Sequence, residues 1–317
     1  MRLVVTGALG HIGSQLIRDL AVQYPGTEIV MIDNLSTQRY ASLFKLPEPG
    51  RYSFMEADVR SLDLATIFAG ARAVVHLAAM TDAASSVEKG AELEANNLGA
   101  TKAVCDACVR SGTPLLWPSS TSVYGSQNSL VAEDCPAEEL QPQSPYATTK
   151  LKEEELIRRY VAQHDLRAVI CRFGTIFGTS VGMRFHTAVN KFCWQAAMGQ
   201  PITVWRTAYD QKRPYLDLTD AIRAMSFIVE NQVFDGRIYN VLTLNATVRH
   251  IVETIRDFVP ALDVSFVDSR IMNQLSYEVS CERFVQLGFR FQGDLRRGVG
   301  DTIALLHGAS GSRRGRD

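Results

Sequence analysis

The sequence predicts an α/β fold, a doubly wound parallel sheet with a smaller C-terminal lobe. Short continuous apolar runs alternate with helical patterns through the first half of the chain, as in parallel sheets covered by helices on both faces. After Gly178 the alternation loosens into loop, helix and short strands, which indicates a smaller second part. The 317 residues, 46% hydrophobic and 21% charged, suffice for one large domain and a lobe.

The strands of the first half are predicted in order by the runs RLVVT, EIVMID, YSFMEAD, AVVHLAA, PLLWPSS and RAVICRF. Helical patterns separate them at HIGSQLIRDLAVQY, at about 92–111 and from Ser144 onward. Later strands are predicted at PITVW, RPYLDL and GRIYNV, with a helix at TDAIRAMSFIVE. We therefore expect residues 1–175 to form the sheet domain, with about 205–240 returning to it, and 176–307 to form mainly the lobe. The small, basic tail 308–317 is expected to be disordered.

Composition narrows the class of partner. A net charge of −1 and a pI of about 6.6 argue against a nucleic-acid surface. No apolar run reaches the roughly 18–20 residues of a membrane span, and no leader pattern is seen, so a cytoplasmic protein is expected. The six cysteines are scattered and read as reduced thiols. Cys105 and Cys108 have CxxC spacing, but they lie in a helical pattern without a second ligand pair, so no metal site is expected.

A glycine turn joins the first strand to the first helix. The stretch VVTGALGHIGSQL carries Gly7, Gly10 and Gly13, which allow the backbone to turn tightly and to approach a pyrophosphate at a helix N-terminus. Asp33 ends the second strand, where a carboxylate accepts ribose hydroxyls and repels a 2′-phosphate. These features predict a Rossmann-type domain that binds NAD rather than NADP, with Asp58 and Val59 near the adenine. The alternative is a tight packing turn with a solvated aspartate.

The stretch SPYATTK combines a helix start with a possible proton-transfer pair. Ser144 can cap the helix and Pro145 suits its first position. Tyr146 and Lys150 are four residues apart and share a helix face. A nearby ammonium and a positively charged nicotinamide ring are expected to move the phenol's pKa from near 10 towards neutrality. Tyr146 is thus predicted as a general base or acid, the alternative being a capped helix start alone. Farther along this helix, Glu154 and Arg158 are expected to pair.

Hydroxyl side chains follow the strand PLLWPSS. Ser119, Ser120, Thr121 and Ser122 come at its carboxyl end, the edge where ligands bind in such sheets. They are predicted to face a substrate oxygen, the alternative being a polar turn.

Together these stretches resemble the extended short-chain dehydrogenase/reductase family, in particular its NAD-dependent nucleotide-sugar epimerases and dehydratases of the UDP-glucose 4-epimerase type. The matching stretches stand in family order, and RPYLDLTDA and YNV extend the match into the second half. In the first half they are TGALGHIG, Asp33, ADVR, HLAA, NNLGAT, SSTSVYG, SPYATTK and RFGTIFG.

The resemblance implies a role for each matching residue. Tyr146 would be the acid/base, Lys150 would tune it and bind the nicotinamide ribose, and Ser120 would bridge substrate and tyrosine. A homodimer joined by the helices near 92–111 and 145–164 is also implied. The implied NAD contacts, besides Tyr146 and Lys150, are Gly7, Gly10, Ile12, Gly13, Asp33, Asp58, Val59, Leu77, Ala78, Ala79 and Asn97.

The residues after Ser120 bear on the reaction. The family's 4,6-dehydratases carry an Asp-Glu pair directly after the catalytic hydroxyl, whereas this chain has Thr121 and Ser122. The resemblance therefore favours epimerisation at C4 of a nucleotide-diphosphate sugar, with UDP as the favoured nucleotide, through a 4-keto intermediate. The alternatives are a dehydratase that recruits Cys193 or His186, a net NAD-dependent oxidoreductase, and a binding protein without turnover.

The second half is expected to bind the nucleotide diphosphate. The resemblance places Arg213 at a phosphate-contacting arginine, and Asn190 and Arg270 are further phosphate candidates. Surface ion pairs are the alternative for the arginines. Trp205 would flank the base or belong to the core, and His186 and Met183 would shape the sugar pocket or only pack. The implied substrate contacts are Thr121, Ser122, Thr175, Asn190, Trp205, Arg213 and Arg270, with Thr175 standing where many epimerases have asparagine.

Overall fold

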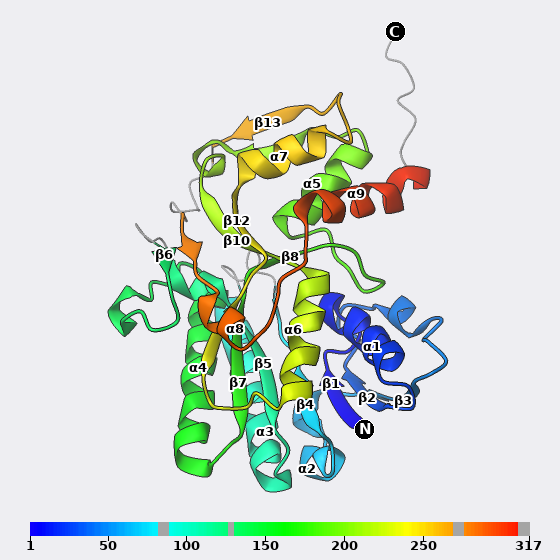
Figure 1. The fold of residues 1–317 in the computed structure, drawn as a ribbon, viewed down its shortest axis with the longest axis vertical. Coiled ribbons are helices and arrows are strands. Elements are labelled where there is room, and N and C mark those ends of the chain that lie inside the picture. The colour runs from blue at the N-terminus through cyan, green and yellow to red at the C-terminus, as the bar shows by residue number, and fades with distance from the viewer. Residues whose placement is uncertain (82–88, 126–129, 269–275, 310–317) are drawn as a thin grey trace.

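A seven-stranded parallel sheet forms the centre of the molecule. The computed structural model describes residues 1–81, 89–125, 130–268 and 276–309. The strand order is β11-β7-β5-β4-β1-β2-β3 (Figure 1), so the order reverses between β1 and β4. The predicted doubly wound α/β fold is confirmed. The strands are β1 (Arg2–Thr6), β2 (Glu28–Asp33), β3 (Arg51–Glu56), β4 (Ala73–His76), β5 (Leu115–Ser120), β7 (Ala168–Phe173) and β11 (Ile238–Val241).

Helices cover both faces of this sheet. Helices α1 and α6 pack together on one face, and α2, α3 and α4 cover the other. Successive strand residues point to opposite faces, so Leu3 and Val5 join the first core while Val4 joins the second. The bounds are α1 (His11–Gln23), α2 (Leu64–Phe68), α3 (Gly90–Ser111), α4 (Pro145–His164) and α6 (Leu218–Asn231).

The second part of the chain lies beyond the carboxyl ends of the central strands (Figure 1). It holds a three-stranded sheet, β12-β10-β8, and two strand pairs, β13-β9 and β14-β6. A separate core around Phe177 and Ile251 joins the helices here. The elements are β6 (Leu130–Val131), β8 (Thr175–Phe177), α5 (Ala188–Ala197), β9 (Ile202–Trp205), β10 (Lys212–Asp217), β12 (Leu244–Thr247), α7 (Val248–Arg256), β13 (Val264–Val267), β14 (Glu278–Val279) and α9 (Leu295–Leu306). Helix α8 (Glu282–Gln286) instead packs against β11 of the central sheet, with Phe284 in the first core.

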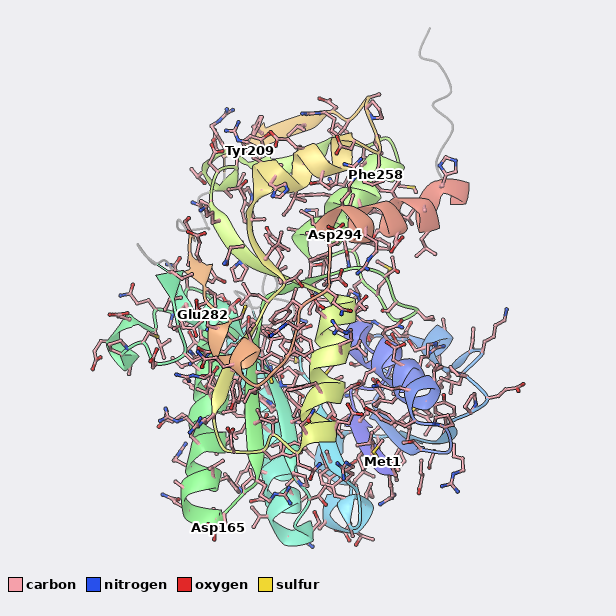
Figure 2. The ribbon with its side chains drawn as sticks, viewed as in Figure 1. Met1, Asp165, Tyr209, Phe258, Glu282 and Asp294 are labelled. Atoms are coloured by element: carbon pink, nitrogen blue, oxygen red, sulfur yellow. The ribbon has the colours of Figure 1, made fainter. Side chains whose placement is uncertain are left out.

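The chain returns to the central sheet after β10, because α6 packs beside α1 and β11 pairs with β7 at the sheet edge. Figure 2 places Asp165, which follows α4, and Tyr209, which follows β9, at opposite ends of the molecule. Within the described ranges, no helix combines the length and apolarity needed to cross a bilayer.

Candidate active site at the carboxyl edge of the sheet

The glycine turn brings three backbone segments into contact. Gly7 has a φ of +64°, and a Cβ there would meet the backbone of Leu77 and Ala78 at 2.6 Å. A Cβ on Gly13 would lie 2.8 Å from the backbone of Ala8 and closer still to the Gly7 carbonyl oxygen. No side chain fits at either position, so the turn holds β1, α1 and the end of β4 at distances that only glycine permits.

The N-terminus of α1 opens directly from this turn. The amide of Ser14 donates to the Gly10 carbonyl at 2.8 Å, and the earlier helical amides precede the helix's own hydrogen-bond ladder. These are the amides of His11, Ile12 and Gly13. Together with the positive end of the helix dipole they suit a pyrophosphate. The backbone therefore fits the dinucleotide that the sequence predicts.

Asp33 ends β2 and is bound to the turn. Its Oδ2 accepts from the Leu9 amide at 3.0 Å and its Oδ1 accepts from the Leu35 amide at 2.9 Å. A carboxylate has about four acceptor positions, so capacity for ribose hydroxyls remains. Asp33 both holds the turn and faces the region beyond it.

Arg39, which the sequence did not predict to be part of the site, lies beside the glycine turn. Its Nη1 lies 3.5 Å from where a Cβ on Gly10 would stand, so the guanidinium lies over the turn. Burial, followed by the positive charge of Arg184, lowers the pKa of Arg39 to about 10, and Asp33 opposes that shift. The available signal was its place on the loop after β2, at the carboxyl edge of the sheet.

Two predicted adenine contacts are engaged within the protein. The Asp58 side chain accepts from the Arg60 amide at 2.8 Å and pairs with the Arg60 guanidinium at 2.6 Å. Val59 is buried in the core beneath α3. Asp58 therefore shapes the turn after β3 and is held with its carboxylate ion-paired.

Asn97, a predicted cofactor contact, is bonded to the segment that follows β4. Its Oδ1 accepts from the Met80 amide at 2.9 Å and its Nδ2 donates to the Met80 carbonyl at 3.0 Å. The side chain is buried, and both ends of the amide hold the segment that follows β4. Asn97 thus anchors the segment after β4 at Met80, and its own contact with NAD stays a prediction.

Helix α4 begins as the sequence predicted. The Ser144 hydroxyl accepts from the Ala147 amide at 3.1 Å, and Pro145 is the first helical residue. The Lys150 Nζ lies 6.0 Å from the centre of the Tyr146 ring and 4.3 Å from that of Trp117, and it donates to the Pro118 carbonyl at 3.4 Å. The helix therefore presents the tyrosine and lysine together, beside the end of β5.

The pKa of Tyr146 corrects one expectation. Burial raises this pKa above its ordinary value, Lys150 lowers it and Glu153 raises it further. The predicted effect of Lys150 is present with the predicted sign, but burial is the larger influence. The ammonium alone does not bring the phenol towards neutrality.

The hydroxyl residues after β5 divide into two groups. Ser119 is buried and donates to Glu154 at 2.5 Å, while the Ser120 and Ser122 hydroxyl oxygens lie 2.8 Å apart. Glu154 also forms two hydrogen bonds with Arg172 of β7, at 2.9 and 2.7 Å. The predicted Glu154–Arg158 pair is therefore wrong, because Glu154 faces the interior and closes a buried network there. This network fixes the strand end that presents Ser120.

Arg213 is the predicted phosphate contact whose setting best suits an anion. It lies half-buried on β10, and its Nε is buried without a hydrogen-bond partner in the described ranges. Its positive charge lowers the pKa of Tyr277, although burial outweighs it. The Tyr277 hydroxyl lies 3.5 Å from that of Thr121. Tyr277 thus joins the second part to the hydroxyl loop, which the sequence did not reveal. Thr175 lies on β8, opposite Tyr215 of β10.

The other residues predicted to contact the substrate have different settings in the structure. Asn190 is fully buried, and its side-chain amide bonds both the amide and the carbonyl of Gly178 at 3.2 Å, which does not support a phosphate contact. Trp205 is 37% exposed at the end of β9, so the core alternative is wrong. His186 is exposed and lies 3.3 Å from Arg184 through its Nε2, and Met183 is half-buried. Arg270 lies outside the described residues.

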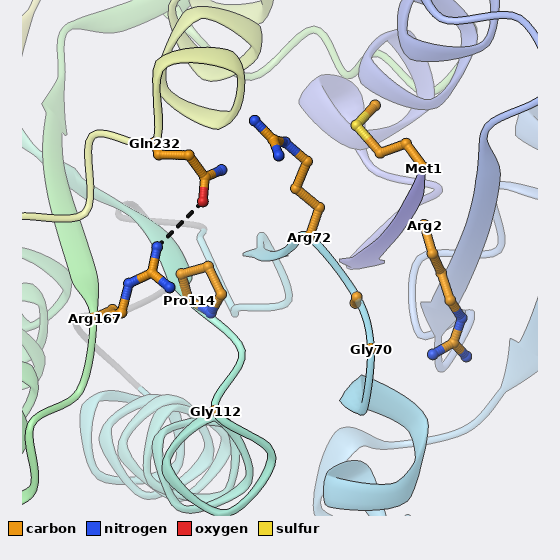
Figure 3. A pocket seen from close by; sticks show the side chains of 9 residues that line it. Met1, Arg2, Gly70, Arg72, Gly112, Pro114, Arg167 and Gln232 are labelled. Carbon is orange, nitrogen blue, oxygen red and sulfur yellow. Dashed lines mark hydrogen bonds between the residues drawn. The ribbon is translucent and has the colours of Figure 1, made fainter.

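A pocket at the opposite end of the sheet contains none of these residues. Its lining includes Arg2, Arg72, Arg167 and Gln232 (Figure 3), and Arg167 donates to Gln232 at 3.2 Å. It lies where the central strands begin, so it is separate from the edge that carries Tyr146 and the glycine turn.

The fold and the edge site define a dinucleotide-dependent enzyme with a tyrosine–lysine pair. The chain belongs to the NAD dependent epimerase/dehydratase family, whose model matches residues 3–241. This assignment confirms the predicted family and its dependence on NAD.

Relatives of both reaction types are similar to this chain. A UDP-glucose 4-epimerase from Azospirillum brasilense is 30% identical over 237 residues, covering 69% of this chain and 65% of the relative. A trifunctional UDP-glucose 4,6-dehydratase/UDP-4-keto-6-deoxy-D-glucose 3,5-epimerase/UDP-4-keto-L-rhamnose-reductase from Arabidopsis thaliana is 26% identical over 95% of this chain. The chain spans 46% of that longer relative. The structure of MoeE5 in complex with UDP-glucuronic acid and NAD superimposes with a TM-score of 0.83 at 26% identity, covering 98% and 100% of the two chains.

Proposed function

We propose that the protein epimerises a nucleotide-diphosphate sugar at C4, through a 4-keto intermediate. The observation that carries this proposal is the arrangement at the end of β5 and the start of α4. Tyr146 and Lys150 stand beside a hydroxyl loop in which Thr121 and Ser122 follow Ser120. Elimination of water needs an acid and a base, and these two positions offer hydroxyls only.

Each of the three catalytic side chains has a distinct role in this proposal. Tyr146 accepts the proton of the sugar 4-hydroxyl and later returns it. Ser120 bridges the sugar oxygen and the tyrosine, and Lys150 stabilises the phenolate and holds the nicotinamide ribose. When bound, NAD supplies a hydride acceptor that can return the hydride to the other face of C4. No external reductant is consumed in such a cycle.

The glycine turn, Asp33 and the segment 77–79 would hold NAD, with Ile12 at the helix N-terminus. The half-buried Arg213, whose Nε has no hydrogen-bond partner among the described residues, would bind the diphosphate of the substrate. Thr121, Ser122 and Thr175 would contact the sugar, and the segment 176–307 would supply most of the nucleotide site. UDP is the proposed nucleotide, in keeping with the Azospirillum relative's name.

The reaction is tested by proton NMR of the purified protein with a panel of UDP-hexoses and UDP-N-acetylhexosamines and trace NAD. The expected result is a new anomeric signal from a sugar of unchanged composition, which approaches equilibrium. A deoxy-keto or alkene signal would mean dehydration, and would direct the search for acid and base to Cys193 and His186. Conversion that stops once the trace NAD has been reduced, and that resumes with added NAD and forms an equal amount of NADH, would mean net oxidation.

We also propose that the protein is a cytoplasmic homodimer that acts in carbohydrate biosynthesis. Helices α3 and α4 pack side by side, as the predicted four-helix interface would need of each protomer. Light scattering coupled to size-exclusion chromatography should give twice the mass of one 35.1 kDa chain. A mass of one chain at all concentrations would refute the dimer.

A further inference from the structure

A buried carboxylate lies beside the tyrosine–lysine pair, on the same helix face. Glu153 follows Lys150 by three positions and Tyr146 by seven, so all three side chains fall on one side of α4. The Glu153 Oε2 lies 3.3 Å from the Lys150 Nζ, and both side chains are almost wholly inaccessible, at 2% and 5%. The remaining oxygen, Oε1, accepts from the Thr101 hydroxyl of α3 at 2.5 Å.

The Glu153 carboxylate is buried but has few hydrogen bonds within the described residues. Oε2 has no hydrogen bond in the described part of the chain, although it is ion-paired with Lys150. Burying a carboxylate is costly unless it is ion-paired and hydrogen-bonded. Among the described residues, the Thr101 hydroxyl and the Lys150 ammonium are the two groups that stabilise it. The ammonium in turn makes only a long bond to Pro118 and stands over the Trp117 ring. Glu153 and Lys150 therefore depend on each other.

Few other charges face this group. His76 of β4 lies close enough for Lys150 to affect it, and burial together with Lys150 lowers its pKa to about 3, so His76 is neutral. Burial, with a smaller contribution from the Glu153 charge, raises the pKa of the Cys105 thiol of α3 to about 12, so this thiol is neutral. Arg172 of β7 is paired with Glu154, next to Tyr124 of the 3-10 turn Thr121–Tyr124. Among the described residues, the charges that act on Tyr146 are thus those of Lys150 and Glu153.

We propose that Glu153 is a positioning residue for the acid/base pair: it anchors the Lys150 ammonium and sets how strongly that ammonium favours the Tyr146 phenolate. An ammonium paired with a carboxylate stabilises a neighbouring anion less than a lone ammonium does. Glu153 thereby keeps Tyr146 as the phenol until a further positive charge, such as the oxidised nicotinamide ring, comes near. The inference builds on the proposed function, but the ionisation of Tyr146 can be measured without turnover.

The test is a pH titration of Tyr146 in the NAD-loaded protein, followed by NMR of ¹³Cζ-labelled tyrosine. The Tyr146→Phe variant assigns the signal. The Glu153→Gln variant removes the charge at nearly constant shape and should lower the apparent pKa of Tyr146 by about one unit. Where turnover is measurable, the acidic limb of kcat/KM should move to lower pH by the same amount. The matched control is Glu155→Gln, an exposed carboxylate on the same helix, which should move neither.

A Tyr146 titration in the folded Glu153→Gln protein that matches wild type, or moves to higher pH, would overturn the proposal. Should Glu153→Gln fail to fold, Thr101→Val provides a second test. It removes the hydroxyl that shares the Glu153 charge, so the carboxylate acts more strongly on the Lys150 ammonium and Tyr146 should titrate at a slightly higher pH. An unshifted Tyr146 in folded Thr101→Val would then count against the proposal. If the wild-type protein epimerises none of the sugars tested while the pKa of Tyr146 still shifts in Glu153→Gln, the epimerase assignment is refuted and the positioning role of Glu153 stands.

Discussion

Tyr146 is the residue on which the proposed chemistry depends most. Its phenol is disfavoured as an anion by burial and by Glu153, and favoured by Lys150. A general base works best when its pKa lies near the working pH, so the proposed role of Tyr146 depends on the balance among these three influences. The pKa of Tyr146 is set by these surroundings.

Replacement of Tyr146 by Phe removes only the hydroxyl. Turnover should fall by about 10²–10⁴-fold, because proton transfer loses its positioned partner, while NAD stays bound through the glycine turn. Initial rates and the NAD content of the purified variant check both parts. Unchanged turnover would refute the acid/base role.

At this scale the sequence revealed local relations and missed distant ones. The Ser144 cap and the Tyr146–Lys150 spacing follow from positions three or four apart, and both are seen. The partners of Glu154, Asn97 and Asn190 lie on other elements or loops, so helical spacing could not predict them. Tyr277 was not predicted because only the fold brings it to Thr121, whereas Arg39 stands on a loop at the predicted carboxyl edge of the sheet.

At the scale of elements, α4 is held by its buried charges. Glu154 and Arg172 are 3% and 2% exposed and 2.7 Å apart, and Ser119 completes the group. They connect α4 to β7 and to the end of β5. The helix that presents Tyr146 is thereby fixed to the strand end that presents Ser120.

The Glu154→Gln change leaves the Arg172 guanidinium buried without its counter-charge. The free energy of unfolding should fall by about 3–5 kcal/mol. The matched control is Glu94→Gln, which breaks the exposed Lys152–Glu94 pair between α3 and α4 and should cost less than about 1 kcal/mol. Chemical denaturation of the variants measures both, and equal losses would contradict the buried-network account.

The glycine turn makes a second prediction at this scale. In Gly13→Ala the new methyl would meet the backbone of Gly7 and Ala8, so NAD affinity should drop by at least about tenfold, with lowered stability. Gly99 lies inside α3, where a Cβ would meet only the Arg60 side chain at 3.4 Å. Gly99→Ala should therefore leave NAD binding intact and should stabilise the helix slightly. Isothermal titration with NAD distinguishes the two, and wild-type affinity in Gly13→Ala would contradict the tight turn.

The elements themselves were predictable because each has its own periodic signal. The runs that predicted β1, β2 and β3 are short and apolar, and the pattern at about 92–111 matches α3 closely. The pairing of β13 with β9 and of β14 with β6 could not be predicted, because it joins strands far apart in sequence. The roles of the two parts of the chain in binding stay predictions.

At the scale of the whole molecule, the half-buried His11 and the buried His76 connect stability to pH. Burial lowers the pKa of His11 to about 4 and that of His76 to about 3. Each is neutral in the folded chain and titrates near 6.5 in the unfolded chain. Below pH 6.5 the unfolded state binds more protons, so stability present above that pH is lost on acidification.

Each histidine should reduce the free energy of unfolding by about 1 kcal/mol per pH unit between pH 6.5 and its folded pKa. The His76→Asn variant, if folded, should show a shallower loss than wild type over this range. Urea denaturation at about pH 7.5, 6.5 and 5.5, in steps around the pKa of the unfolded chain, gives the slope. Parallel slopes in the two proteins would show that His76 does not contribute.

The central claim is that the hydrogen at C4 leaves the sugar and returns to the same carbon. The most direct test uses a UDP-hexose labelled with deuterium at C4, converted by the purified protein in ordinary water and analysed by NMR and mass spectrometry. We expect an epimer that keeps its deuterium at C4, because Tyr146 exchanges only the hydroxyl proton. Deuterium on another ring or side carbon, or a product without the label, would contradict C4 epimerisation.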